Sequence, residues 1–178
     1  MEFVAAAHAV IVRGEGDDVT QARSRNSLLR LFGSPQELLS KAHADLGRLV
    51  AALSRGEQRA ALWALMDCAI AVFHTGDWIR ATHTDHHAAS LRFARSSQRI
   101  RIVRDICHAA KHGDLTWKPA QVAAHGPTVV KLEYQRGLGE QRQASVWVTT
   151  NDQSRHDVVD VLHRAISEWT QFLDQRGV

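Results

Sequence analysis

The 178-residue chain lacks the features that identify most small enzymes and secreted domains. Its two cysteines, Cys68 and Cys107, are too few for a disulfide framework and fall in apolar helical patterns. We therefore expect buried free thiols in a reducing compartment. The sequence has no glycine-rich phosphate loop, paired CxxC, HExxH or GxSxG. These absences argue against zinc fingers, common nucleotide hydrolases and standard serine hydrolases.

Targeting and membrane signals are also scarce. The opening stretch MEFVAAAHAVIVR has an acidic second residue and no basic n-region, and its apolar run is too short to cross a bilayer. The apolar fraction of 44%, the charged fraction of 23% and the net charge of +3 are those of an ordinary globular protein. We therefore expect a cytoplasmic protein without a membrane partner, a resident cofactor or a resident metal.

The sequence predicts one main domain over residues 34–178, preceded by an apolar run and loop in residues 1–33. A first helix begins where Ser34 is the N-cap, Pro35 follows and Glu37 completes a capping box. Arg55 and Gly56 end it, because glycine favours the position just past a helix.

The next segment predicts the central helix of a bundle. Residues 57–75 contain ALWALMDCAIAVF, which is apolar on nearly every side, and Trp63 is interpreted as a packing residue. After a break at HTDHHAAS, helical residues resume near position 86, with an interruption at RSSQ, and continue to His112.

After this helix the apolar residues no longer recur at helical spacing but at every second position. VVKLEYQ and ASVWVTT alternate apolar and polar residues and are joined by RGLGEQR, which predicts an antiparallel hairpin over about 128–150. A last helix is expected from near Asn151 or Ser154, with Trp169 on its core face. The predicted fold is mainly α: a four- to five-helix bundle with one β-hairpin inserted before the C-terminal helix.

The helix RIVRDICHAAKHG carries an unusual polar face. At about 100° per residue, its charged and imidazole side chains share a sector of roughly 100°: Arg101, Arg104, Asp105, His108 and His112, with Lys111 beside them. A histidine can act as general acid or base while a guanidinium holds a phosphate, which is what metal-free RNA cleavage requires. Asp105 could orient a histidine or pair with Arg101. The alternative is a solvated polar face without chemistry.

A second group of polar residues lies in FHTGDWIRATHTDHH. His74 and Asp77 share a helix face at spacing i, i+3, and could meet His108 and His112 if their helices are adjacent. Imidazole with carboxylate suits zinc, nickel or iron, so a metal-binding bundle is one hypothesis. A capping segment with exposed histidines is the other. Trp78 is interpreted as a core aromatic in preference to a base-stacking platform.

The stretch VRDICHAAKHG resembles the end of the HEPN superfamily signature, in which four to six residues separate an arginine, often followed by a polar residue, from a histidine. Arg101 and His108 satisfy that spacing. Arg104 and Asp105 match the arginine–polar pair of the signature. However, the separation of Arg104 from His108 is one residue too short, and its separation from His112 is one residue too long. A different register leaves only His112 in place, with Cys107 at the arginine position.

The chain also resembles a group of uncharacterised bacterial and phage-associated proteins that pair an H-x-x-D-W segment with a later KH. Here the matching residues are His74, Asp77, Trp78, Lys111 and His112. The HEPN resemblance implies a small helical bundle that binds RNA or a nucleotide. It also implies a metal-independent ribonuclease of the toxin or defence type, with the motif helices meeting across a homodimer cleft.

Under this hypothesis the catalytic candidates are Arg101, Arg104, His108 and His112, and the binding candidates are His74, Asp77, Trp78 and Lys111. Two alternatives belong to other classes. One is a non-catalytic interaction module, such as an accessory or antitoxin-like protein with a protein partner. The other is the metal-binding bundle.

Overall fold

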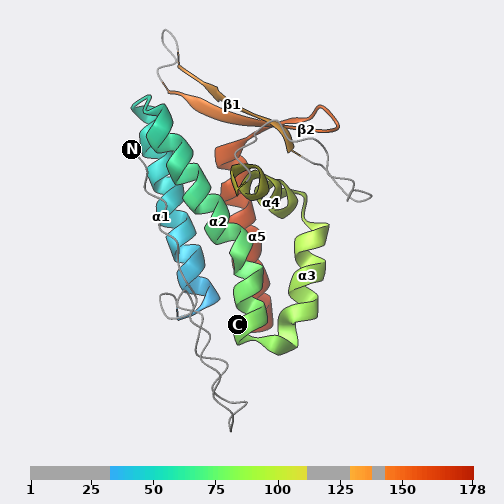
Figure 1. Cartoon of the computed structure of the whole chain (residues 1–178). Helices are drawn as coiled ribbons and strands as arrows, with labels where there is room; N and C mark the ends of the chain where they lie inside the picture. The colour runs from blue at the N-terminus through green and yellow to red at the C-terminus, as the bar shows by residue number, and fades with distance from the viewer. Residues whose placement is uncertain (1–32, 112–128, 138–142) are drawn as a thin grey trace, which may run out of the picture. The chain divides into compact units, whose positions relative to one another are not determined.

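Helices dominate the described part of the chain. The structure is a computed structural model that describes residues 33–111, 129–137 and 143–178. The predicted N-terminal run and loop, together with His112, lie outside these residues. Within them, five α-helices and an antiparallel three-stranded sheet confirm the mainly α prediction (Figure 1). No helix among the described residues is long and apolar enough to cross a membrane.

The elements follow the predicted order. They are α1 (Pro35–Ser54), α2 (Gln58–Thr82), the 3-10 turn η3 (Thr84–His86), α3 (His87–Ser96), α4 (Gln98–Lys111), β1 (Val129–Gln135), β2 (Ser145–Thr150), β3 (Arg155–Asp157) and α5 (Val158–Arg176). Helices α1 and α2 lie side by side, α5 packs against them, and the sheet lies across one end of the helices (Figure 1).

Helix α1 begins as its capping residues predict. The Ser34 hydroxyl accepts a hydrogen bond from the Glu37 backbone N–H at 3.2 Å. The Glu37 carboxylate reaches back one residue further than in a standard capping box, to the backbone N–H of Gly33 at 2.5 Å. Gly56 lies beyond the helix with φ of +69°, a left-handed conformation that glycine adopts without strain.

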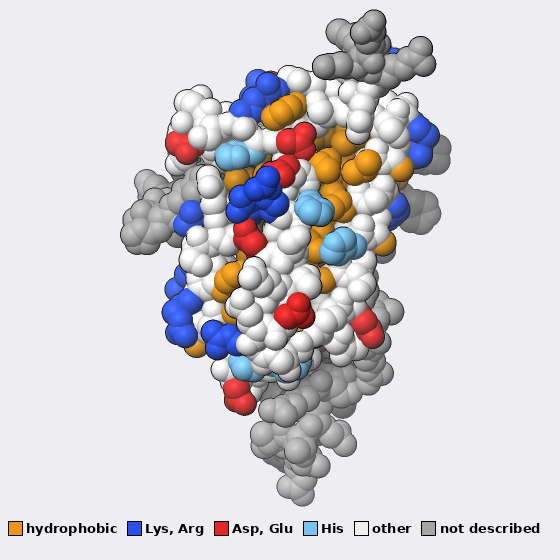
Figure 2. Space-filling view, turned by 180° about the vertical axis from the view of Figure 1, so that it is seen from behind, with side chains coloured by type: hydrophobic (Ala, Val, Ile, Leu, Met, Phe, Trp, Pro, Cys, Tyr) orange, Lys and Arg blue, Asp and Glu red, His pale blue; other side chains and the backbone are white. Residues whose placement is uncertain are grey.

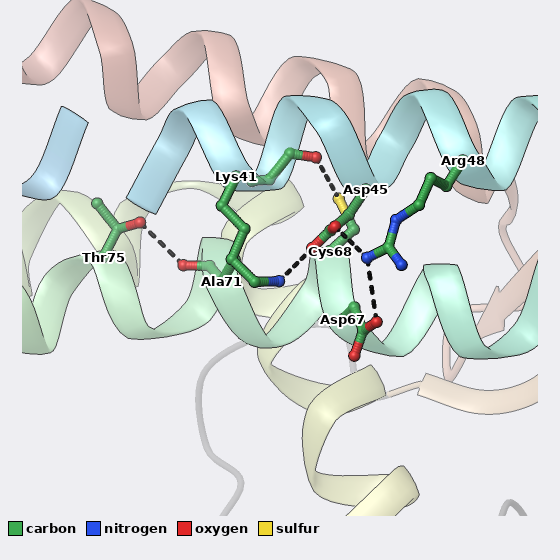
Figure 3. Close-up of polar contacts among 8 residues, drawn as sticks. Lys41, Asp45, Arg48, Asp67, Cys68, Ala71 and Thr75 are labelled. Atoms are coloured by element: carbon green, nitrogen blue, oxygen red, sulfur yellow. Dashed lines mark hydrogen bonds and ion pairs between the residues drawn. The ribbon is translucent and has the colours of Figure 1, made fainter. Parts of the chain in front are cut away.

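A buried carboxylate lies on the α1 side of the contact between α1 and α2. Asp45 is buried and forms ion pairs with Lys41 and Arg48 of its own helix. Arg48 extends to Asp67 of α2 at 3.2 Å, so one guanidinium bridges the two helices (Figure 3). Beside it, the Cys68 thiol donates to the Ala42 carbonyl at 3.3 Å. Since both carboxylates have cationic partners, this polar cluster is compatible with close helix packing.

Helix α2 is the central helix, as predicted, and contacts α1, α3, α4 and α5. It continues to Thr82, beyond the expected end at Thr75 or one turn later. The prediction for Trp63 was wrong: its side chain is 62% exposed. In a helix that is apolar on nearly every side, periodicity does not identify which side faces the core.

The interruption predicted at RSSQ is Ser97, which ends α3 and caps α4. Its hydroxyl accepts from the Ile100 N–H at 3.1 Å and donates to Glu168 of α5. Arg99 binds the same carboxylate at 2.8 Å. The junction of α3 and α4 is therefore fixed to α5 by two side chains.

The predicted hairpin is present, with β1 and β2 antiparallel and Leu132 opposite Val148. Period two is visible in β2, where Val146, Val148 and Thr150 are buried. The short strand β3 was not predicted, and it pairs with β2 through residues 155–157. Because these residues continue the sheet, α5 begins at Val158 and not near Asn151 or Ser154. Asp157 caps it by accepting from two backbone N–H groups.

Aromatic packing anchors α5 in the core. Trp169 is fully buried, as predicted, and its ring lies 5.2 Å from that of Phe93 on α3 and 5.7 Å from that of Phe172. Both distances are typical of edge-to-face aromatic pairs. The core thus joins residues from α3 and α5 that lie far apart in the sequence.

Both cysteines are free and buried, as predicted. Burial raises the pKa of Cys68 and of Cys107 from an ordinary value near 9 to about 12, because the thiolate is poorly solvated there. The raised pKa contributes stability below about pH 9. That contribution is lost as the pH rises toward 12, since only the unfolded thiols ionise in that range.

We expect neither thiol to react with a disulfide reagent at pH 8 in the folded protein. Both should react at once in denaturant, because unfolding returns them to water and to their ordinary pKa. The measurement is the absorbance of the released thiolate with and without urea, with the Cys68→Ala and Cys107→Ala variants assigning the signals. Rapid native reaction of either thiol would contradict its burial.

Candidate functional site

The two faces of α4 are those the sequence predicts. Ile102, Val103 and Ile106 are buried in the core. Arg101 and Arg104 are partly exposed, and His108 is exposed. The guanidinium and imidazole groups of this helix therefore lie at the protein surface.

Asp105 does not belong to that face, contrary to the sequence interpretation. Its side chain is only 1% exposed and accepts two hydrogen bonds from Arg104, at 2.9 Å from Nε and 2.8 Å from Nη2. The position lies at the edge of the predicted polar sector, roughly 60° from Ile102 around the helix. Arg104 covers the carboxylate, so the two side chains form a structural ion pair.

Helices α2 and α4 bring two histidines to one aromatic ring. The Phe73 ring lies 5.1 Å from the imidazole of His74 and 5.6 Å from that of His108, between ring centroids. The His108 contact is edge-to-face, at an interplanar angle of 90°. Helices α2 and α4 are therefore adjacent at this point, and we call His74, Asp77, Arg101 and His108 the α2–α4 site.

His74 is oriented by a carboxylate. Its Nδ1 lies 2.7 Å from Oδ2 of Asp77, and both side chains are about half exposed. A carboxylate only accepts hydrogen bonds, so the neutral imidazole carries its proton on Nδ1. Nε2 is then the basic nitrogen that a ligand or substrate would meet. The second oxygen of Asp77 contacts Arg80 at 3.3 Å.

The two arginines of α4 differ in electrostatic environment. The charge of Arg104 is balanced by Asp105. Arg101 donates from Nη1 to the Arg95 carbonyl at 3.0 Å and forms no ion pair within the described ranges. Arg101 lies seven residues before His108, on the same face two turns away. Within the described part of α4, the charge of Arg101 is the one not balanced by a carboxylate.

Trp78 does not join this surface. Trp78 is 7% exposed and packs in the core, in agreement with its interpretation as a core aromatic. Lys111 is the last residue of α4, and nothing is described of its side chain or of His112. Among the described residues there is no cluster of three or more histidine, cysteine or acidic side chains that could hold a metal.

Two residues that contact the α2–α4 site, Phe73 and Arg80, were not predicted from the sequence. Phe73 is the last residue of the apolar run and was interpreted only as part of it, yet both histidines contact its half-buried ring. Arg80 stands three residues after Asp77, a spacing that indicates an ion pair on one helix face. Exposed histidines lie beside hydrophobic side chains on the face in Figure 2.

Replacing Arg104 with methionine should lower the free energy of unfolding by about 1–3 kcal/mol, because it leaves the Asp105 carboxylate buried without its cation. The estimate is below that for a fully buried pair, since Arg104 is 41% exposed. Adding Asp105→Asn should recover part of the loss. Urea denaturation measures each variant.

The matched control is Arg164→Met on α5, whose partner Asp160 is exposed. This change should alter stability by less than about 0.5 kcal/mol. Equal losses of unfolding free energy in Arg104→Met and Arg164→Met would show that the fold tolerates the buried Asp105 carboxylate without Arg104.

Comparisons of the chain with protein-family models, curated proteins and solved structures gave no match. What the α2–α4 site does must therefore follow from its own side chains. These are two imidazoles on adjacent helices, a carboxylate that orients one of them, and an arginine without a carboxylate partner among the described residues.

Proposed function

We propose that the α2–α4 site binds RNA and cleaves it without a metal ion. The observation that carries the proposal is the contact of His74 and His108 with one Phe73 ring, with Asp77 orienting His74. Paired imidazoles can supply a general base and a general acid close to neutral pH. The resemblance of Arg101 and His108 to the HEPN signature supports the same chemistry, and a toxin or defence role rests on that resemblance alone.

The chemistry is an internal transesterification. One imidazole takes the proton of the ribose 2′-hydroxyl while the 2′ oxygen attacks the adjacent phosphorus. The bond from phosphorus to the 5′ oxygen breaks, and the second imidazole protonates that oxygen. The products are a 2′,3′-cyclic phosphate and a 5′-hydroxyl. No redox partner or additional reactant is needed.

Arg101 is the proposed phosphate-binding residue. Negative charge grows on the phosphate oxygens as the 2′ oxygen attacks, and a fixed guanidinium stabilises that charge. Arg104 is assigned a structural role, because Asp105 already holds it. Lys111 and His112 follow His108 in the sequence and are proposed to contribute further positive charge along the RNA.

Single-stranded RNA with a fluorescent label should be cleaved by the full chain in excess chelator, leaving 2′,3′-cyclic phosphate ends. His108→Ala and His74→Ala should each reduce the rate by about 10²–10⁴-fold, the range for loss of a general acid or base. Arg101→Ala should weaken RNA binding and flatten its salt dependence, because one phosphate contact is lost. Gel analysis of products and fluorescence anisotropy measure the two effects.

The control is His163→Ala, which removes an exposed histidine of α5 and should leave cleavage and binding unchanged. Circular dichroism establishes that each variant is folded. Wild-type protein that binds RNA through Arg101 but does not cleave it would overturn the catalytic half of the proposal. Protein that neither binds nor cleaves would overturn both halves and favour the interaction-module class.

A further inference from the structure

A second surface lies outside the α2–α4 site, where the C-terminal half of α1 meets the N-terminal half of α2. It is an open hollow of about 420 Å³ lined by alanines of both helices. Arg48 of α1, Arg55 directly after α1, and Trp63 and Asp67 of α2 also line it. We call this the Trp63 hollow.

Trp63 is conspicuous at this place because it is exposed. Arg59 lies over its ring, with the guanidinium carbon 4.9 Å from the ring centroid. Tryptophan and arginine are the residues most enriched where protein interfaces gain their binding energy. A tryptophan buries about 150–250 Å² when it is covered, so its exposure leaves a large favourable term unused.

The charges around the hollow are balanced, which identifies the kind of partner. Arg48 is paired with Asp45 and Asp67, and Arg55 is paired with Glu57 at 2.8 Å. A polyanion such as RNA would gain little binding energy here, because three carboxylates already lie beside these arginines. A partner with alternating charges of its own fits better.

A second copy of this chain has that charge pattern. Arg59 lies four residues before Trp63 and Asp67 four residues after it, so the three occupy one face of α2. When two such helices pair antiparallel about a two-fold axis through Trp63, each Arg59 faces the partner's Asp67. The two tryptophans then meet at the axis, beside the alanine-lined hollows of both protomers. The arrangement is isologous and closes at two copies.

From this we infer that the Trp63 hollow is a homodimer interface. In this register α2 overlaps its copy over residues 58–68, about 16 Å, and two adjacent helices present a face about 20 Å wide. That face is roughly 320 Å² per protomer, an area typical of a weak dimer that forms only at high protein concentration. Unlike the dimer that the HEPN resemblance implies, this one does not place α4 at the axis.

Sedimentation velocity of the full chain at about 50 µM tests the inference, the chain mass being 19.8 kDa. Wild-type protein should sediment as a dimer. Trp63→Ala should weaken association at least about tenfold, as for a central interface tryptophan. Arg59→Asp and Asp67→Arg should each weaken it as well, because each places like charges opposite one another twice.

Charge reversal gives the decisive comparison. Mixing Arg59→Asp chains with Asp67→Arg chains should restore a dimer, since both facing pairs are then attractive, and the double variant should also dimerise. The matched control reverses the exposed Arg164–Asp160 pair of α5 one residue at a time and should change nothing.

Three outcomes would overturn the inference. They are a wild-type chain that stays monomeric at 50 µM, a dimer that survives Trp63→Ala and Arg59→Asp, and a failure of the two charge variants to associate when mixed. If Trp63→Ala weakens RNA binding in a monomeric chain, the occupant of the hollow is nucleic acid. A negative RNA cleavage result leaves the sedimentation outcome unaffected, so the two proposals fail separately.

Discussion

The described structure depends on one constraint: α2 must pack against several neighbours and still leave one side in water. It contacts α1, α4 and α5, and its small buried residues allow these helices to approach closely. The positions that remain exposed include Trp63, Ile70 and His74 and follow a spacing of seven and four residues along one face. Both surfaces proposed to have a function therefore include residues from the exposed side of α2.

Two buried carboxylates show how the bundle tolerates charge. Asp45 and Asp105 each lie on a helix beside arginines that are more exposed than they are. Arginine can cover a carboxylate while its own charge stays in contact with water, which reduces the desolvation cost. This separates arginines that hold the fold together from those that are available to a ligand. Arg104 belongs to the first group and Arg101 to the second.

Local rules predicted much of the fold from the sequence. The Ser34 cap, the break at Ser97 and the alternation of β2 each depend on residues within one or two turns. The exposure of Trp63 and the burial of Asp105 were not predictable in this way, because each is decided by which helices come to lie nearby. Proximity of His74 and His108 was expected only on the condition that α2 and α4 are adjacent, which tertiary packing alone determines. Strand β3 has three residues, too few for periodicity to show.

Glu168 makes the position of the start of α4 depend on α5, which is the last helix to be synthesised. This residue of α5 holds Ser97 and Arg99 at the start of α4, and its neighbour Trp169 fills the core beside α3. Until the last helix has left the ribosome, the contacts of Ser97 and Arg99 with Glu168 are missing, and α4 can pack chiefly against α2 and α3. The start of α4 therefore becomes fixed only after translation of α5 is complete.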